Sequence, residues 1–237
     1  MNKVIKYKQI EDDILNDIHN GKLKPGDKIA AESALKKKYN VSTITVRKAF
    51  NDLINAGYLY GIQGLGTYVS KAHVERDTAS IDLYRDIKSK GMETSLKIIS
   101  IKKSNSKEIR KILETADDET VYCISRVRYS NDYPIAYHQS YISRLSLDQL
   151  KECKKYESFY AFLDKYGLEP EWIKESYHAI GVSQDDACEY LGLKKGSPAF
   201  YAIRTAYDAQ NKPIEYCESV FEKDHYSVTT TIKNIAK

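Results

Sequence analysis

Residues 41 to 70 restrict the possible folds of this chain more than any other stretch, because a helical pattern runs directly into a glycine-rich hairpin. Ser42 is a favourable N-cap, and the apolar residues after it recur at helical spacing: Val46, Ala49, Phe50, Leu53 and Ile54. Gly57 ends this pattern. Two short β-rich runs, 58–60 and 67–69, then flank three glycines that permit positive φ and close approach of the backbone: Gly61, Gly64 and Gly66. The stretch predicts a helix followed by a hairpin whose tip is mostly backbone.

Two shorter helical patterns precede this stretch. The first has Gly21 as its C-cap and carries on one face Tyr7, Ile10, Ile14 and Ile18. After turn residues at 25–27, the second ends at Asn40 and carries Ala31, Ala34, Leu35 and Tyr39. The second and third helices, joined through Asn40 and Val41, predict a helix-turn-helix with the hairpin as its wing. The second helix of such a motif enters the major groove of DNA.

The exposed side of the third predicted helix is polar near its N-terminus. It carries Thr43, Thr45, Arg47, Lys48 and Asn51. Short hydroxyls, one arginine and the free amides of a helix N-terminus suit contacts with bases and phosphate. An ordinary solvated helix face would have the same pattern. Ile44, beside this polar side, would either contact a thymine methyl group or pack against the second helix.

Positive charge is concentrated in the first third of the chain. Residues 1–71 contain 12 Lys and Arg against 7 Asp and Glu, whereas residues 72–237 contain 25 against 26. A domain that meets a polyanion, joined to one that does not, has this distribution. A surface with five excess positive charges also arises by chance, so charge alone leaves nucleic-acid binding open.

The remaining composition favours two globular domains. The 237 residues, 42% hydrophobic and 30% charged, suffice for two modest cores. No apolar run approaches the roughly 20 residues that span a bilayer, so we expect a cytoplasmic protein without a membrane segment. The four cysteines form no C-x-x-C pair and the five histidines are scattered. We therefore predict no metal site, no cofactor and no catalytic residue.

The second half of the sequence contains a weak internal duplication. Each copy has a helical run followed by two strand patterns and a turn between them. Arg126 and Arg204 are 78 residues apart, and after a one-residue insertion Pro134 and Pro213 are 79 apart. Two such units predict a mainly antiparallel sheet with helices packed on it, an α+β fold with internal pseudo-symmetry.

Alternation along the first strand of this duplication places two arginines on one face. Arg126 and Arg128 lie two residues apart, on the same side as Tyr122 and Ile124. Neighbouring guanidinium groups repel each other unless an anion lies between them, and arginine suits bidentate recognition of phosphate or carboxylate. Two separate salt bridges to nearby acids are the alternative.

Nearly all of residues 6 to 70 resemble a known family in one continuous register. The motifs K-Y-x-Q-I, L-K-P-G-D-K-I, Y-x-V-S-x-x-T-V-R-K-A, L-x-x-x-G-Y-L and G-x-G-T-Y-V follow the winged-helix domain of the GntR family of bacterial transcription regulators. The resemblance implies DNA contacts at Ser42, Thr43, Thr45, Arg47 and Gly66. We add three neighbours to the predicted DNA-binding residues: Glu32, Lys48 and Thr67.

Two departures from the family pattern predict weaker and less salt-sensitive DNA binding. Residues 30–33 read A-A-E-S where the family usually has P-S-E-R, which removes a capping hydroxyl and a phosphate-binding arginine. Thr43 stands where a further arginine usually follows the serine. Each lost phosphate contact flattens the log–log salt dependence by about 0.9.

Residues 81 to 226 resemble the effector domain of the HutC branch of the same family. The likeness rests on R-x-R-Y with P-I-A-Y, on S-F-Y, and on P-I-E-Y-x-x-S-x-F-x-x-D. In relatives that sense phosphorylated sugars this pattern holds the phosphate, which here implies Arg126, Arg128, Ser158 and Tyr160. Glu215 stands where the family often sets an acid against ligand hydroxyls. His138 replaces a frequent Glu and Phe221 a frequent Tyr, so the identity of the sugar is open.

The combined interpretation is an α+β protein with a winged helix-turn-helix over 1–71, a linker over 72–80 and an effector-binding and dimerisation domain of chorismate-lyase-like fold over 81–237. We expect a homodimeric repressor that binds a palindromic DNA operator and responds to a small anionic metabolite, a phosphorylated sugar in the first instance. A chorismate-lyase-like enzyme acting on a small carboxylate is one alternative. A DNA-binding protein whose second domain only dimerises is another.

Overall fold

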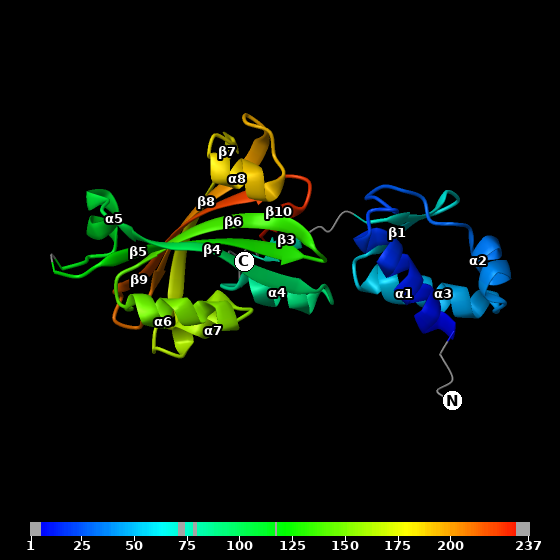
Figure 1. Cartoon of the computed structure of the whole chain (residues 1–237), viewed down its shortest axis with the longest axis horizontal. Helices are drawn as coiled ribbons and strands as arrows, with labels where there is room; N and C mark the ends of the chain where they lie inside the picture. Colours follow the sequence, from blue (N-terminus) through cyan, green and yellow to red (C-terminus); the bar gives the residue numbers. More distant parts are fainter. Residues whose placement is uncertain (1–5, 71–73, 78–79, 117, 231–237) are drawn as a thin grey trace, which may run out of the picture. The chain divides into compact units, whose positions relative to one another are not determined.

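The computed structural model describes residues 6–70, 74–77, 80–116 and 118–230, and the chain divides into two compact units. One unit comprises residues 1–73 with 88–93, and the other comprises 74–87 with 94–237 (Figure 1). Among the described residues there is no helix with the length and apolar character needed to cross a membrane.

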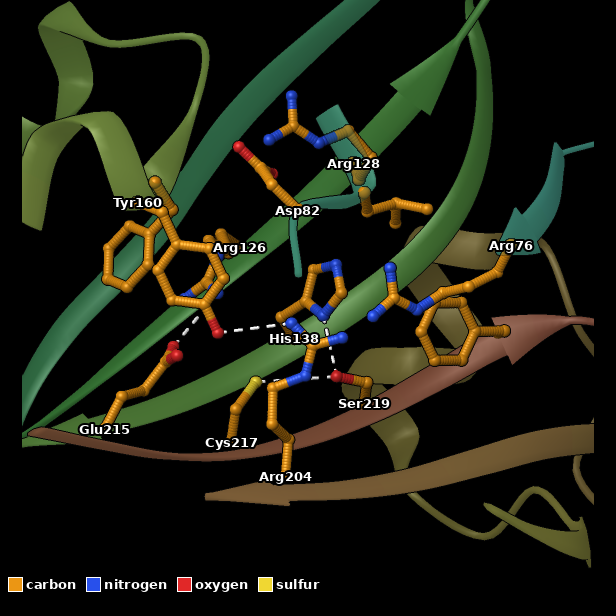
Figure 2. A pocket seen from close by; sticks show the side chains of 13 residues that line it. Arg76, Asp82, Arg126, Arg128, His138, Tyr160, Arg204, Glu215, Cys217 and Ser219 are labelled. Carbon is orange, nitrogen blue, oxygen red and sulfur yellow. Dashed lines mark hydrogen bonds and ion pairs between the residues drawn. The ribbon is translucent and has the colours of Figure 1, made fainter. Parts of the chain in front are cut away.

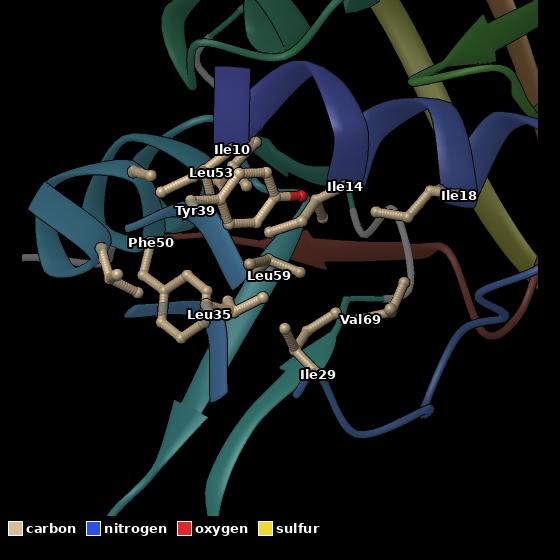
Figure 3. Close-up of a cluster of buried hydrophobic side chains, with 12 residues drawn as sticks. Ile10, Ile14, Ile18, Ile29, Leu35, Tyr39, Phe50, Leu53, Leu59 and Val69 are labelled. Carbon is tan, nitrogen blue, oxygen red and sulfur yellow. The ribbon is translucent and has the colours of Figure 1, made fainter. Parts of the chain in front are cut away.

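The N-terminal unit has the three helices and the hairpin that the sequence predicts. Its helices are α1 (Lys6–His19), α2 (Glu32–Tyr39) and α3 (Thr43–Asn55). Strands β1 (Leu59–Ile62) and β2 (Gly66–Val69) pair antiparallel. The apolar residues at helical spacing meet in one core, which Figure 3 shows: Ile10, Ile14, Ile18, Ile29, Leu35, Tyr39, Phe50, Leu53, Leu59 and Val69.

Local signals fix the helix ends in this unit. Asn40 adopts a left-handed φ of 50° after α2, and the Oγ of Ser42 accepts a hydrogen bond from the Thr45 amide at 3.2 Å, so both predicted caps are confirmed. Ala31, at the N-cap of α2, makes no side-chain capping hydrogen bond. The missing capping hydroxyl therefore leaves the start of α2 without that stabilisation.

The C-terminal unit is built on a six-stranded antiparallel sheet in the order β4-β5-β6-β9-β8-β7. Its strands are β4 (Thr94–Ser104), β5 (Val121–Ser130), β6 (Tyr133–Ile142), β7 (Trp172–Gly181), β8 (Pro198–Tyr207) and β9 (Pro213–Glu222). One face packs against α6 (Leu147–Lys151), the 3₁₀ helix η1 (Glu152–Lys155) and α7 (Phe159–Asp164). The opposite face packs against α5 (Lys107–Ile112) and α8 (Asp185–Leu191). The predicted α+β architecture is confirmed.

The internal duplication is visible in the sheet register. Strands β4-β5-β6 and β7-β8-β9 form two equivalent halves that meet where β6 pairs with β9. Gln139 faces Glu218 across this junction, and these two residues are 79 positions apart, the offset found between Pro134 and Pro213. The pseudo-twofold axis therefore passes between Gln139 and Glu218.

The predicted linker over 72–80 is wrong at its centre. Val74–Asp77 form strand β3, which pairs in parallel with β10 (Tyr226–Thr229). Val74 is fully buried, and Arg76 is only 1% exposed because it pairs with the carboxylates of Asp86 and Glu175. The segment is polar and aperiodic in the sequence, and the partner strand β10 and Glu175 both lie far along the chain. Residues 72–73 and 78–79 of the predicted linker lie outside the described residues.

Candidate functional site

Five of the eight predicted DNA-binding residues lie on α3 or at its N-cap, away from the side that packs into the core. Arg47 and Lys48 are exposed, Thr43 and Thr45 are half-buried, and Ser42 is exposed at the N-cap. Val46, Ala49, Phe50 and Leu53 are buried on the inner side. The helix therefore presents its hydroxyls and cations together at its N-terminal end.

Glu32 and Lys48 each have a partner within the unit. The Nε of Arg47 donates to both carboxylate oxygens of Glu32, at 3.2 and 3.0 Å. The Nζ of Lys48 donates to Asp52 at 3.1 Å and lies 4.6 Å from the ring centroid of Tyr7. The carboxylate of Glu32 thus holds the Arg47 guanidinium, which is a positioning role rather than a direct contact with an anion.

The tip of the wing is formed by backbone that a side chain would disturb. Gly66 is exposed with a φ of 125°, and a Cβ added there would lie 2.9 Å from the Cε of Lys28. Thr67 is half-buried, and its carbonyl accepts a hydrogen bond from the Ile29 amide at 2.8 Å. The positive φ is what favours glycine here, because the flexible end of the Lys28 side chain can move away from an added Cβ.

A small cavity of about 40 Å³ lies in the C-terminal unit, on the sheet face that carries α7. Figure 2 shows side chains that converge on it from separate strands and loops. Four of them are arginines, Arg76 from β3, Arg126 and Arg128 from β5, and Arg204 from β8. Its other lining residues are Asp82, Leu83, His138, Phe159, Tyr160, Glu215, Cys217, Ser219 and Phe221.

Arg126 is paired, but its partner retains an unused oxygen. One terminal nitrogen of Arg126 donates to Ser140 Oγ at 2.5 Å and the other lies 3.3 Å from Glu215 Oε1, while its Cζ sits 3.7 Å over the Phe159 ring. Ser140 Oγ also donates to Glu215 Oε1. The second oxygen of Glu215 is buried and has no hydrogen-bond partner among the described residues. A buried acceptor without a partner is costly, so this oxygen is available to a donor entering the cavity.

Arg128 differs from the other three arginines. It is only 4% exposed, donates to Thr94 Oγ1 at 3.3 Å, and forms no ion pair with a carboxylate in the described parts of the chain. Burial lowers the pKa of the Arg128 guanidinium to about 10, against the opposing attraction of Asp82. Arg128 is therefore a buried cation whose charge lacks direct compensation.

Arg76 and Arg204 share one carboxylate. Glu175 accepts from Arg204 Nε at 2.8 Å and lies 3.4 Å from a terminal nitrogen of Arg76. Arg76 also pairs with Asp86 at 2.8 Å. Arg204 donates to the Tyr160 hydroxyl at 3.1 Å. The carboxylate of Glu175 thus links a cavity arginine from β8 to one from β3.

His138 and Phe221 line the cavity from the two strands that meet at the pseudo-twofold axis, β6 and β9. His138 Nδ1 and Ser219 Oγ are 2.7 Å apart, and the imidazole ring meets Phe221 edge-on with ring centroids 5.8 Å apart. Burial, followed by the charges of Arg126 and Arg128, holds the pKa of His138 well below its ordinary value of 6.5. His138 is therefore neutral at pH 7 and can either donate or accept a hydrogen bond.

Six of the seven predicted ligand residues line this cavity, and Ser158 does not. Ser158 caps α7 by accepting from the Ala161 amide at 3.1 Å, and its hydroxyl donates to Asp82 at 2.6 Å. It reaches the cavity only through Asp82. Sequence reasoning missed five polar lining residues: Arg76, Asp82, Arg204, Cys217 and Ser219. Arg204 could have been found, because it is the counterpart of Arg126 in the duplication.

A winged helix followed by a sheet domain with an arginine-lined cavity defines a DNA-binding regulator with an effector domain. The family of bacterial regulatory proteins named gntR matches residues 6–69, and the UTRA domain matches residues 89–227. The chain belongs to the HutC branch of the GntR family of transcription regulators. It is a regulator and not an enzyme.

Similar proteins cover nearly the whole chain. The HTH-type transcriptional repressor NagR of Bacillus subtilis (strain 168) is 30% identical over 224 residues, 93% of this chain and 92% of NagR. The mannosyl-D-glycerate transport/metabolism system repressor MngR of Escherichia coli (strain K12) is 26% identical and covers 94% of each chain. The crystal structure of PhnF from Mycobacterium smegmatis has the same fold, with a TM-score of 0.64 at 17% identity, covering 99% of this chain and 100% of PhnF.

Proposed function

We propose that this protein is a homodimeric repressor whose C-terminal unit binds a small anionic sugar derivative, a phosphorylated sugar in the first instance. The main support for this proposal is that two polar groups in one cavity are incompletely paired among the described residues. Arg128 is buried without a carboxylate partner in the described chain, and Glu215 has a buried oxygen without a donor there. An anionic group satisfies the first and a sugar hydroxyl satisfies the second.

The similar proteins support this chemistry. The name of MngR concerns mannosyl-D-glycerate, a sugar derivative that carries a carboxylate. A further relative, 26% identical over 231 residues, is a probable fructoselysine utilization operon repressor of Shigella flexneri. Both names concern sugar-derived compounds, so a hydroxyl-rich anionic effector is the class we propose for this chain.

Binding in the cavity would also change contacts of β3, and this is how an effector could act beyond the C-terminal unit. A volume of about 40 Å³ holds little more than water, so a sugar phosphate must displace lining side chains. An anion that draws Arg204 away from Glu175 changes the partners of Arg76. Arg76 lies on β3, the first strand after the N-terminal unit in the sequence. We propose that this change alters the geometry of the dimer so that it fits its palindromic operator less well.

We also propose that the N-terminal end of α3 and the wing form the DNA-binding surface. Thr43, Thr45 and Arg47 contact the major groove, Gly66 and Thr67 lie along the adjacent minor groove, and Glu32 holds Arg47 in position. As a bacterial transcription regulator, the protein would act in the cytoplasm. The alternative that its second domain serves only to dimerise predicts that no anionic sugar binds there.

A thermal-shift and calorimetric screen tests the effector assignment. The probes are glucose 6-phosphate, glucosamine 6-phosphate, fructose 6-phosphate and mannosyl-D-glycerate, each beside its parent sugar without the phosphate or glycerate group. We expect at least one anionic probe to raise the melting temperature, and its parent sugar to have no effect. Arg128→Met abolishes the shift, because it removes the uncompensated cation.

Arg144→Met is the matched control. Arg144 pairs with Asp208 at 2.7 Å and does not line the cavity, so this variant should respond like the wild type. A response that survives Arg128→Met would place the anion elsewhere. The absence of any response across the panel would favour the domain that only dimerises.

A further inference from the structure

Ile44 is an apolar residue in an unexpected place. It is the second residue of α3 and its side chain is 81% exposed, more than any other large apolar side chain in the described part of the chain. The packing alternative raised by the sequence, contact with the second helix, does not account for a side chain that lies so largely in water. Burial of an aliphatic side chain normally contributes to stability, and Ile44 forgoes nearly all of that contribution in the free protein.

The neighbours of Ile44 indicate what can cover it. Arg47 and Lys48 follow three and four positions later, so they share its face of the helix, and both are exposed. Side chains in a helix lean toward its N-terminus, which places Ile44 over the first turn, beside the Ser42 cap. The isoleucine therefore lies amid the cations and hydroxyls that the proposed DNA-binding surface presents.

The chemistry of the major groove offers one apolar group. Among the four base pairs only those with thymine expose a methyl group there, whereas every other base edge offers donors or acceptors. Isoleucine has neither donor nor acceptor, so covering a polar base edge would leave that edge without a partner. A protein partner would also have to cover Arg47 and Lys48, while DNA phosphates satisfy both.

We infer that Ile44 contacts the 5-methyl group of a thymine in each half-site and thereby sets part of the operator sequence that this protein prefers. This inference rests on the proposed DNA binding and adds a specificity-determining residue to it. It is independent of the effector cavity. The effect expected per methyl group is about fourfold in affinity, the size of burying one methyl group.

The test first identifies the DNA sequence that the protein prefers. Full-length wild-type protein selects its preferred sequence from a pool of random DNA duplexes. Each symmetric pair of thymines in that sequence is then replaced by uracil, which removes only the methyl groups. We expect the replacement of one such pair to lower the affinity by roughly 16-fold, because the two half-sites contribute about fourfold each. Ile44→Ala should bind the thymine and uracil duplexes equally well.

Leu65→Ala is the matched control for loss of an exposed aliphatic side chain. Leu65 lies at the wing and is 59% exposed, so its truncation should leave the thymine-to-uracil ratio at the wild-type value. Unchanged melting temperatures for both variants exclude a folding defect. Wild-type binding that ignores uracil at every position, or discrimination that persists in Ile44→Ala, would overturn the inference. If no sequence is enriched at all, the proposed DNA binding fails together with it.

Discussion

Arg47 in the N-terminal unit and Arg128 in the C-terminal unit are both proposed to bind an anion, but they differ in solvent exposure and in ion pairing. The side chain of Arg47 is 66% exposed and shares a partly exposed ion pair with Glu32. Arg128 is buried among other arginines and has no carboxylate within ion-pair distance in the described chain. Water and salt screen the first site and largely spare the second.

Changes at these two sites should therefore differ in whether they affect folding or only binding. Exposed ion pairs contribute at most about 1 kcal/mol, so the surface of α3 can vary at little cost to the fold. A buried charge that loses its partner costs several kcal/mol. The buried arginine cluster is therefore part of the stability of the C-terminal unit as well as its candidate binding site.

The largest effect is expected from Arg76→Met. Removing this guanidinium leaves the buried Asp86 and the half-buried Glu175 with reduced compensation, which should lower the free energy of unfolding by about 3–5 kcal/mol. Urea unfolding followed by circular dichroism measures it. A loss below about 1 kcal/mol would show that the two carboxylates do not depend on Arg76.

Acid should destabilise the protein through His138. Its pKa in the folded state lies well below 6.5, so the unfolded chain takes up a proton near pH 6.5 that the folded chain does not. Stability is therefore fully present above pH 6.5 and falls as the pH drops below it, by about 1.4 kcal/mol between pH 7.5 and 5.5. His138→Gln should remove this part of the pH dependence of urea unfolding. An unchanged pH dependence in that variant would mean that His138 already binds its proton in the folded state.

The two helix caps of the N-terminal unit should respond in opposite directions. Ser42→Ala removes the cap that Thr45 uses and should destabilise the unit by about 1 kcal/mol. Ala31→Ser supplies the cap that α2 lacks and should stabilise the unit by a few tenths to about 1 kcal/mol. Thermal unfolding of both variants beside the wild type measures the pair. Two changes of the same sign would be inconsistent with this account of the helix ends.

The smallest effect on folding is expected from Arg47→Ala. Stability should change by no more than about 0.5 kcal/mol, because the ion pair with Glu32 is solvent-exposed. DNA affinity should still fall, and if Arg47 contacts phosphate, the log–log salt slope should drop by about 0.9. Fluorescence anisotropy across a salt series measures both the DNA affinity and its salt slope. An unaltered affinity would remove Arg47 from the proposed DNA-binding surface.

The sequence predicted those parts of the fold that depend on local patterns. Helices α1 to α3 follow from apolar spacing and from caps such as Ser42 and Asn40, all within a few residues of one another. The paired hairpins of the sheet followed from the duplication that relates Arg126 to Arg204. Arg126 and Arg128 share a face because alternation along a strand is itself a local rule.

The parts that escaped prediction depend on long-range contacts. Arg76 is buried because β3 pairs with β10, roughly 150 residues later in the chain, and because Glu175 lies on β7. Ser158 turns its hydroxyl to Asp82, 76 residues earlier, instead of lining the cavity. Neither partner leaves a periodic signal near the residue concerned.

We propose that an anion bound among the cavity arginines weakens DNA binding by the full-length protein. The direct measurement is the affinity for the selected duplex with and without the anionic sugar that gives the largest thermal shift. We predict a decrease of at least about fivefold in the wild type and in Arg144→Met, and no change in Arg128→Met. A bound anionic sugar that leaves the wild-type DNA affinity unchanged would contradict the account.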